Sequence, residues 1–165
     1  MSDLFEIEPL YSEILPGLFI SGTDDADVLG KTDLFTLMDK EQPFDSVVCL
    51  YIAANPAGSY VREQRFAIPD GPISESAKPE LMQLAYWLHG EWKAGKKAAG
   101  KCQAGWNRSS LVVALVLLIE GYTAEEAVEL IREKRSPNAL CNSYFVDHIH
   151  EIYESNFRSP SLQAS

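Results

Sequence analysis

Apolar residues are unevenly spread along the chain, and their densest run, from Leu111 to Ile119, contains no charged side chain. A helix that is apolar on every side has to be buried. Residues 109–120 are therefore predicted to form the central helix of the domain, and Gly121 is predicted to end it. The run is nine residues long, which is too short to cross a bilayer.

Three further segments place apolar residues at helical spacing. The first covers residues 79–92 and begins with a proline, which suits the first turn of a helix. The second follows Thr123, which can form a capping box with Glu126. The third follows Asn142, a favourable N-cap residue. These segments predict a helical second half of the chain.

Five short strands are predicted. The run 46–51 is β-branched and apolar, as in a strand that is buried on both faces, and Cys49 within it is expected to be a small core residue. Residues 12–21 read as two strands around a Pro-Gly turn, and residues 62–68 as a further strand. Residues 96–101 contain no β-branched or aromatic side chain. They are assigned as a strand by position alone.

Two short helices are predicted nearer the N-terminus, one capped at Thr23 and one within residues 31–41. Strands interleaved with helices, followed by a helical cluster, indicate an α/β fold with a small, largely parallel central sheet flanked by helices. We expect residues 1–165 to form a single domain with its core at about residues 11–155 and loose tails at both ends.

Composition narrows the choice of partners. The chain is 46% hydrophobic and carries a formal net charge of −10, which disfavours nucleic acid and anionic membranes as partners. Its three cysteines, Cys49, Cys102 and Cys141, include no Cys-x-x-Cys pair, and this count suits a reducing compartment. Residues 1–8 lack the apolar run of a signal peptide. We expect a cytoplasmic monomer.

One segment departs from the overall acidity. No acidic residue lies between Trp92 and Ile119, whereas five of the fourteen Lys and Arg residues do. Within it, Cys102 and Arg108 stand six positions apart, with a glycine between them and a serine directly after the arginine. A tight loop between a strand and a buried helix gathers backbone N–H groups around an anion. The pattern therefore predicts an anion-binding loop.

The residue types of this loop suit nucleophilic chemistry on a phosphate. Cysteine attacks only as the thiolate, which a helix N-terminus and nearby cations favour. Cys102 would have the following helix and the charges of Lys101 and Arg108 nearby. Gly105 permits a curled backbone, and the guanidinium of Arg108 can hold two phosphate oxygens at once. Ser109 can donate a hydrogen bond to the sulfur, which would help the sulfur leave.

The stretch resembles the signature loop of the cysteine-dependent protein tyrosine phosphatases, in which Cys, five residues, Arg and then Ser or Thr surround the phosphate. Asp70, 32 residues before Cys102, is spaced like the general acid of the dual-specificity branch. Residues 14–20 are similar to that branch's opening strand pair. Its closing-helix signature is matched by Arg135, Asn142 and Phe145. The resemblance covers about residues 11–153.

The resemblance implies a mechanism without a metal or other cofactor. Cys102 would attack phosphorus and form a phosphocysteine, and Asp70 would protonate the departing oxygen and then activate water. Ser109 would assist the sulfur. The phosphate would be bound by the loop residues Gln103, Ala104, Gly105, Trp106, Asn107 and Arg108.

The implied substrate is a phosphorylated protein or peptide, with phosphotyrosine first and phosphoserine or phosphothreonine as further substrates. Two alternatives remain open. A phosphoinositide or RNA 5′-phosphate phosphatase of the same fold usually carries extra Lys or Arg in the loop, whereas Gln103, Ala104, Trp106 and Asn107 are neutral. A phosphate-binding pseudophosphatase is the other alternative. Lys101 favours it, because the family usually has His there and uses it to set the loop geometry.

Other residues have more than one interpretation. Asp70 lies in a Pro-Asp-Gly-Pro turn, where Asp is common, and Glu75 is the fallback acid. Trp106 is predicted either to line the pocket mouth or to pack against the protein. Cys49 is also a conceivable redox partner of Cys102. The three histidines are expected to be surface or packing residues, without metal-ligand spacing and without a Cys–His dyad: His89, His148 and His150.

Overall fold

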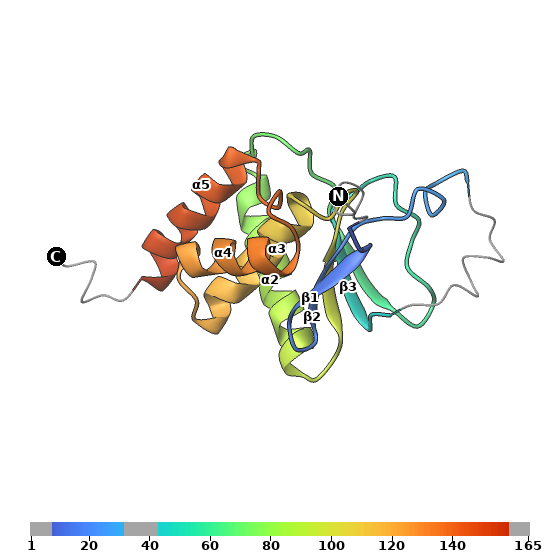
Figure 1. The fold of residues 1–165 in the computed structure, drawn as a ribbon, viewed down its shortest axis with the longest axis horizontal. Coiled ribbons are helices and arrows are strands. Elements are labelled where there is room, and N and C mark those ends of the chain that lie inside the picture. Colours follow the sequence, from blue (N-terminus) through green and yellow to red (C-terminus); the bar gives the residue numbers. More distant parts are fainter. Residues whose placement is uncertain (1–7, 32–42, 159–165) are drawn as a thin grey trace, which may run out of the picture.

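A five-stranded sheet lies at the centre of the computed structural model, which describes residues 8–31 and 43–158 (Figure 1). The strand order is β1-β2-β5-β3-β4. β1 and β2 are antiparallel, whereas β2, β5, β3 and β4 run parallel to one another. The strands are β1 (Tyr11–Leu15), β2 (Leu18–Ser21), β3 (Ser46–Cys49), β4 (Arg62–Arg65) and β5 (Ala98–Lys101). The predicted small, largely parallel sheet is confirmed.

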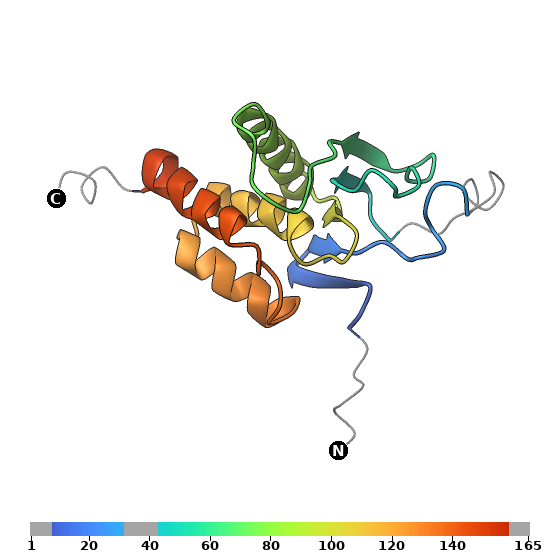
Figure 2. The ribbon, with the colours of Figure 1, turned by 90° about the horizontal axis from the view of Figure 1, so that it is seen from above.

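Within residues 8–31 and 43–158, four α-helices lie together on one side of this sheet (Figures 1 and 2). α3 packs on β2 and β5, α2 on β3 and β5, and α4 on β1. Their bounds are α2 (Ala77–Lys93), α3 (Arg108–Glu120), α4 (Ala124–Lys134) and α5 (Ser143–Ile152), and a π-helical turn, η2 (Tyr153–Phe157), follows. Among the described residues, no helix is long and apolar enough to span a membrane.

Helix ends agree closely with the sequence prediction. α3 is buried along its length from Ser109 to Leu118, and Gly121 ends it with φ 121°. α4 begins with the predicted capping box, in which Thr123 and Glu126 exchange side-chain and backbone hydrogen bonds. Asn142 accepts a hydrogen bond from the backbone N–H of Tyr144 and so caps α5.

The short helix predicted after Thr23 is wrong. Residues 24–31 form turns instead. The side chain of Asp24 accepts a hydrogen bond from the N–H of Ala26 at 2.8 Å, a local contact that competes with helix formation. Val28 then pairs with Ala54 in an isolated bridge. The other short helix, predicted within residues 31–41, lies outside the described residues apart from Lys31, which is in a turn.

The poor strand propensity of β5 has a packing explanation. The strand lies between β2 and β3, and Ala98, Ala99 and Gly100 are all buried. A Cβ atom at Gly100 would lie 2.8 Å from the carbonyl oxygen of Ser109 and 3.1 Å from Val113 Cγ2, both in α3. The helix therefore lies directly on the strand here, and only glycine leaves room for it. The small residues of β5 therefore allow α3, which carries Ser109, to lie close to the sheet.

Candidate active site

The loop from Cys102 to Asn107 connects β5 to α3 at the carboxyl end of the parallel strands. Cys102 is the first residue after β5, and its N–H donates to the carbonyl of Ser21 at 3.1 Å. Its side chain is buried, with 2% exposure, and Sγ lies 3.1 Å from the hydroxyl oxygen of Ser109 in the first turn of α3. The structure thus brings the predicted nucleophile and the predicted serine into contact.

The backbone of this loop offers a row of free donors. Among the described residues, none accepts a hydrogen bond from the N–H groups of residues 103–107. Gly105 adopts φ 74°, a conformation that suits glycine, and a Cβ atom there would lie 2.7 Å from the backbone nitrogen of Gly22. A curled loop with unpaired N–H groups at a helix N-terminus is an anion-binding arrangement. Gly105 is required by both conformation and space.

The outer side of the loop is braced by β2 and by α4. The segment after β2 contributes Thr23, whose hydroxyl donates to the carbonyl of Cys102 and whose N–H donates to the carbonyl of Gln103, both at 2.9 Å. The residue that caps the carboxyl end of α4, Arg135, donates through Nε to the carbonyl of Gly105 at 3.0 Å. These contacts satisfy loop carbonyls. The loop N–H groups are left for a ligand.

Arg135 is a buried anchor with 6% exposure, and this burial lowers the pKa of its guanidinium. Besides the loop, it binds the carbonyls of Pro9 at 2.7 Å and Leu10 at 3.3 Å, together with the hydroxyl of Ser12. Sequence reasoning included Arg135 only as part of a resemblance, and it missed Thr23 as a support of the loop. Contacts between residues so far apart in sequence leave no local pattern.

Arg108 begins α3, and its side chain contacts Ile68 and Tyr51. Its Nη1 donates to the carbonyl of Ile68 at 3.3 Å, and its guanidinium carbon lies 5.4 Å from the ring centre of Tyr51. Its Nε is buried and has no hydrogen-bond partner among the described residues. Buried donors without a partner are costly in a folded protein. This donor suits an anion bound between the guanidinium and the loop.

Asp70 is joined to the loop by two side-chain amides. Its Oδ1 accepts from Asn142 Nδ2 at 2.8 Å, and its Oδ2 accepts from Asn107 Nδ2 at 3.0 Å. The two amides are themselves connected, because the N–H of Asn142 donates to Asn107 Oδ1 at 3.0 Å. A carboxylate is therefore held beside the residue that precedes Arg108. Asp70 comes before α2 in the chain and the loop comes after it, and the fold places the two side by side.

Glu75, the fallback acid, is bound to a lysine outside the loop. Glu75 Oε1 lies 2.8 Å from Lys78 Nζ, and this hydrogen bond lowers the pKa of the Glu75 carboxyl. The described contacts of Glu75 are with residues at the start of α2 and include none with the loop. The geometry favours Asp70 over Glu75 as the carboxylate of the site.

Comparisons with known proteins give a consistent result at the level of fold. No family model matches the sequence, and no curated protein matches it either. Solved structures do match. Human DUSP28 is 19% identical, with 95% of this chain and 97% of that chain covered and a TM-score of 0.72. Human tyrosine phosphatase-like serine/threonine/tyrosine-interacting protein is 21% identical, with 90% and 98% covered and a TM-score of 0.69. The chain has the dual-specificity phosphatase fold.

A third structure widens the range of ligands seen on this fold. PTPMT1, solved in complex with PI(5)P, is 15% identical to this chain, with 95% of this chain and 100% of that chain covered and a TM-score of 0.63. Identities this low establish a shared architecture and leave chemistry to be argued from the residues. The fold class expected from the resemblance is confirmed.

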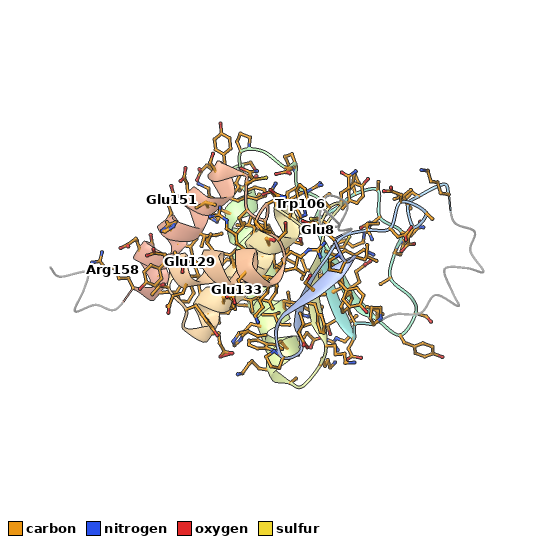
Figure 3. All side chains as sticks on the ribbon, viewed as in Figure 1. Glu8, Trp106, Glu129, Glu133, Glu151 and Arg158 are labelled. Atoms are coloured by element: carbon orange, nitrogen blue, oxygen red, sulfur yellow. The ribbon has the colours of Figure 1, made fainter. Side chains whose placement is uncertain are left out.

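Trp106 packs on the outside of the loop. Its indole Nε1 donates to Glu8 Oε2 at 2.7 Å, and its carbonyl accepts from the N–H of Leu140 at 2.8 Å. Figure 3 shows Glu8 and Trp106 next to each other, near the middle of the view. The other carboxylate oxygen of Glu8 accepts from the hydroxyl of Ser136 at 2.6 Å. Of the two interpretations of Trp106, these contacts favour packing against the protein.

Lys101, where the resemblance predicts a histidine, lies at the end of β5 beside Asp27. Its Nζ is 4.0 Å from Asp27 Oδ2, the side chain is 13% exposed, and burial lowers the pKa of the ammonium. Its register partner in β3 is Cys49, a core residue as predicted, and burial raises the pKa of that thiol. The charge of Lys101 is thus paired with Asp27.

The histidines remain packing or surface residues in the described part of the chain. His89 lies on α2 with its ring 5.9 Å from that of Trp92. His148 and His150 lie on α5. No group of three or more His, Cys, Asp or Glu side chains that could hold a metal is found among residues 8–31 and 43–158.

Proposed function

We propose that this chain is a cysteine-dependent phosphate-monoester hydrolase that dephosphorylates phosphotyrosine in proteins, with phosphoserine and phosphothreonine as further substrates. One observation carries the proposal. The buried Sγ of Cys102 lies 3.1 Å from the Ser109 hydroxyl, at the start of a loop whose N–H groups at residues 103–107 have no acceptor among the described residues. A nucleophile that belongs to an anion-binding loop suits attack on a phosphate.

The first step transfers the phosphoryl group to sulfur. The Cys102 thiolate forms a bond to phosphorus while the bond between phosphorus and the leaving oxygen breaks. Loop N–H groups and the Arg108 guanidinium bind the equatorial oxygens as charge redistributes. Protonated Asp70 gives its proton to the leaving oxygen, so that the product leaves as an alcohol or phenol. The amides of Asn107 and Asn142 hold Asp70 in reach of the loop.

The second step returns the enzyme to its starting state. Asp70, now a carboxylate, takes a proton from water as the water oxygen bonds to phosphorus. The bond between phosphorus and sulfur breaks. The Ser109 hydroxyl, whose oxygen lies 3.1 Å from Sγ, then turns its proton toward the departing thiolate and stabilises it. Inorganic phosphate is released. Asp70 ends protonated and Cys102 ends as the thiolate, as the next cycle requires.

The nature of the loop side chains supports a protein substrate. Apart from Arg108, the loop residues are neutral, and the chain carries a net charge of −10. A polyanionic headgroup or RNA would meet little extra positive charge there. PTPMT1 in complex with PI(5)P has the same fold, so a phosphoinositide is the alternative substrate to test.

The test is a panel of phosphotyrosine, phosphoserine and phosphothreonine peptides together with phosphoinositide vesicles. We expect turnover of phosphotyrosine peptide, and its loss in Cys102→Ser. In Asp70→Asn, kcat/KM should fall far more for esters with poor leaving groups than for those with good ones, because kcat/KM reports the first step and only poor leaving groups need the proton there. Equal loss for both would reject Asp70 as the acid. Undiminished turnover by Cys102→Ser would reject the cysteine mechanism.

A pseudophosphatase is the second candidate, and the position of Lys101 favours it. This residue enters the loop, and its ammonium is paired with Asp27 at 4.0 Å. If Lys101 fails to set the loop for catalysis, the wild-type protein should bind phosphopeptide without hydrolysing it, and Lys101→His should gain turnover. Turnover by the wild type with no gain in Lys101→His would reject this candidate.

A further inference from the structure

The guanidinium of Arg108 is held by few contacts. Among the described residues, the carbonyl of Ile68 accepts from Nη1 at 3.3 Å, and Nε has no partner. The remaining contact is with the aromatic ring of Tyr51, 5.4 Å from guanidinium carbon to ring centre. A long arginine side chain loses much rotamer freedom when it binds an anion, so a surface that orients it beforehand improves affinity.

Tyr51 follows β3 at the edge of the sheet where the loop lies. The residue before it, Leu50, donates its N–H to the carbonyl of Lys101 at 2.8 Å, which joins the end of β3 to the entry of the loop. The Tyr51 side chain is half-buried, whereas Ile52 next to it is 72% exposed. The backbone that carries Tyr51 has left the strand and needs another support.

That support comes from Arg65 at the end of β4. Its Nη2 donates to the carbonyl of Ala54 at 2.7 Å. Longer contacts of 3.4 to 3.5 Å join the same guanidinium to the carbonyls of Tyr51, Ile52 and Asn55. Glu63 Oε1 lies 3.3 Å from its Nη1. One charged side chain thus binds four carbonyls of the five-residue segment 51–55 and fixes its course.

We propose that Tyr51 is a positioning residue for Arg108, and that Arg65 acts through Tyr51 by fixing the segment 51–55. The inference rests on the proposed function, because it takes Arg108 as the phosphate-binding residue. The guanidinium carbon lies over the Tyr51 ring, 5.4 Å from its centre, and Nε has no hydrogen-bond partner among the described residues. A phosphate binds guanidinium N–H groups, so the ring contact and phosphate binding are compatible. The ring orients the cation before the phosphate arrives.

The test measures binding without turnover. In a Cys102→Ser background, titration calorimetry gives the dissociation constant for a phosphotyrosine peptide. Removing the ring in Tyr51→Ala should weaken binding about 5- to 20-fold, the range of a partly desolvated cation–π contact. Tyr51→Phe keeps the ring and should bind within about twofold of Tyr51. Tyr60, which is 98% exposed, supplies the matched control Tyr60→Ala.

Three further variants separate orientation from packing and test the role of Arg65. Tyr51→Leu keeps bulk without a π face and should lose nearly as much affinity as Tyr51→Ala. Binding by Tyr51→Leu equal to that of the parent would overturn the cation–π role. Arg65→Met should weaken binding less than Tyr51→Ala, and the double variant should bind like Tyr51→Ala alone. Fully additive losses would show that Arg65 acts by another route.

The readouts distinguish failure of this inference from failure of the proposed function. If the wild type does not hydrolyse phosphate esters but the peptide affinity depends on the ring at position 51, the hydrolase fails and the inference stands. If the wild type hydrolyses them and Tyr51→Ala changes neither peptide affinity nor kcat/KM, the inference fails. Unfolding temperatures of each variant identify any loss that comes from misfolding, in which case Tyr51→Phe against Tyr51→Leu decides.

Discussion

Replacing Gly100 by alanine is expected to damage both stability and catalysis, because β5 and α3 touch at this residue. The new methyl carbon would lie 2.8 Å from the carbonyl oxygen of Ser109 and 3.1 Å from Val113 Cγ2. Ordinary contacts begin near 3.5 Å, so the start of α3 has to move by about 0.5–1 Å. The nearer contact is with backbone, which cannot rotate away as the Val113 side chain can.

Two effects oppose each other in the free energy of unfolding. Overpacking a well-filled site costs about 1–3 kcal/mol. Alanine recovers about 0.5–1 kcal/mol, because glycine loses more backbone entropy on folding. The steric term wins, and we expect a net loss of about 1–2 kcal/mol. Because Ser109 contacts Cys102 Sγ at 3.1 Å, the same shift should lower kcat by about 10- to 100-fold.

Urea unfolding and turnover of an aryl phosphate measure the two effects. The matched control is Gly90→Ala in α2, where a Cβ atom would meet nothing within 4 Å. Its helical position predicts a gain of about 0.5–1 kcal/mol with unchanged turnover. A Gly100→Ala protein as stable and as active as the wild type would refute the explanation of β5. Loss of stability without loss of turnover would refute the link to Ser109.

Three further predictions address the acid, a buried histidine and a helix cap. Asn142→Ser keeps an N-cap residue on α5 but removes the amide bound to Asp70. Stability should therefore hold, while turnover of esters with poor leaving groups falls. Equal loss for esters with good leaving groups would contradict this. Burial and Lys78 lower the pKa of His148, so the unfolded state binds its proton more readily and stability should fall as pH drops through about 6.5. His148→Leu should flatten that fall in urea unfolding, and an unchanged slope would reject the assignment. Thr123→Ala should cost about 1 kcal/mol in the same assay through loss of the α4 cap, and a cost near zero would count against it.

Local features of the fold could be predicted because they depend on neighbouring residues. The apolar run after Ser109 encodes a buried helix, and the Thr123–Glu126 pair encodes where the next one begins. The β-branched run at 46–51 encodes a buried strand. The failure at Thr23 has the same origin, since a cap signal is local, whereas that residue is used to brace a loop that is 79 residues away.

The support of the candidate site could not be predicted, because it is made by contacts across the fold. Nothing near Arg65 in the sequence indicates that it binds the carbonyls after β3. The strand β5 shows the reverse case, in which local propensity argues against the observed structure. Its small residues are explained only by the helix that lies on them. The resemblance of the loop and of its spacing to a known family made Cys102 and Asp70 candidates, and the fold explains how their side chains are held.

The most direct test of the proposed mechanism is to trap the phosphorylated enzyme. Wild-type protein and Asp70→Asn are mixed with a phosphotyrosine peptide or with an aryl phosphate that has a good leaving group, quenched rapidly, digested and examined by mass spectrometry. The mechanism predicts one phosphoryl group on the peptide that carries Cys102, with more of it in Asp70→Asn when the leaving group is good, because that variant hydrolyses the intermediate slowly. Steady turnover with no phosphoryl group on Cys102 would contradict the mechanism. Turnover retained in Cys102→Ser would contradict it as well.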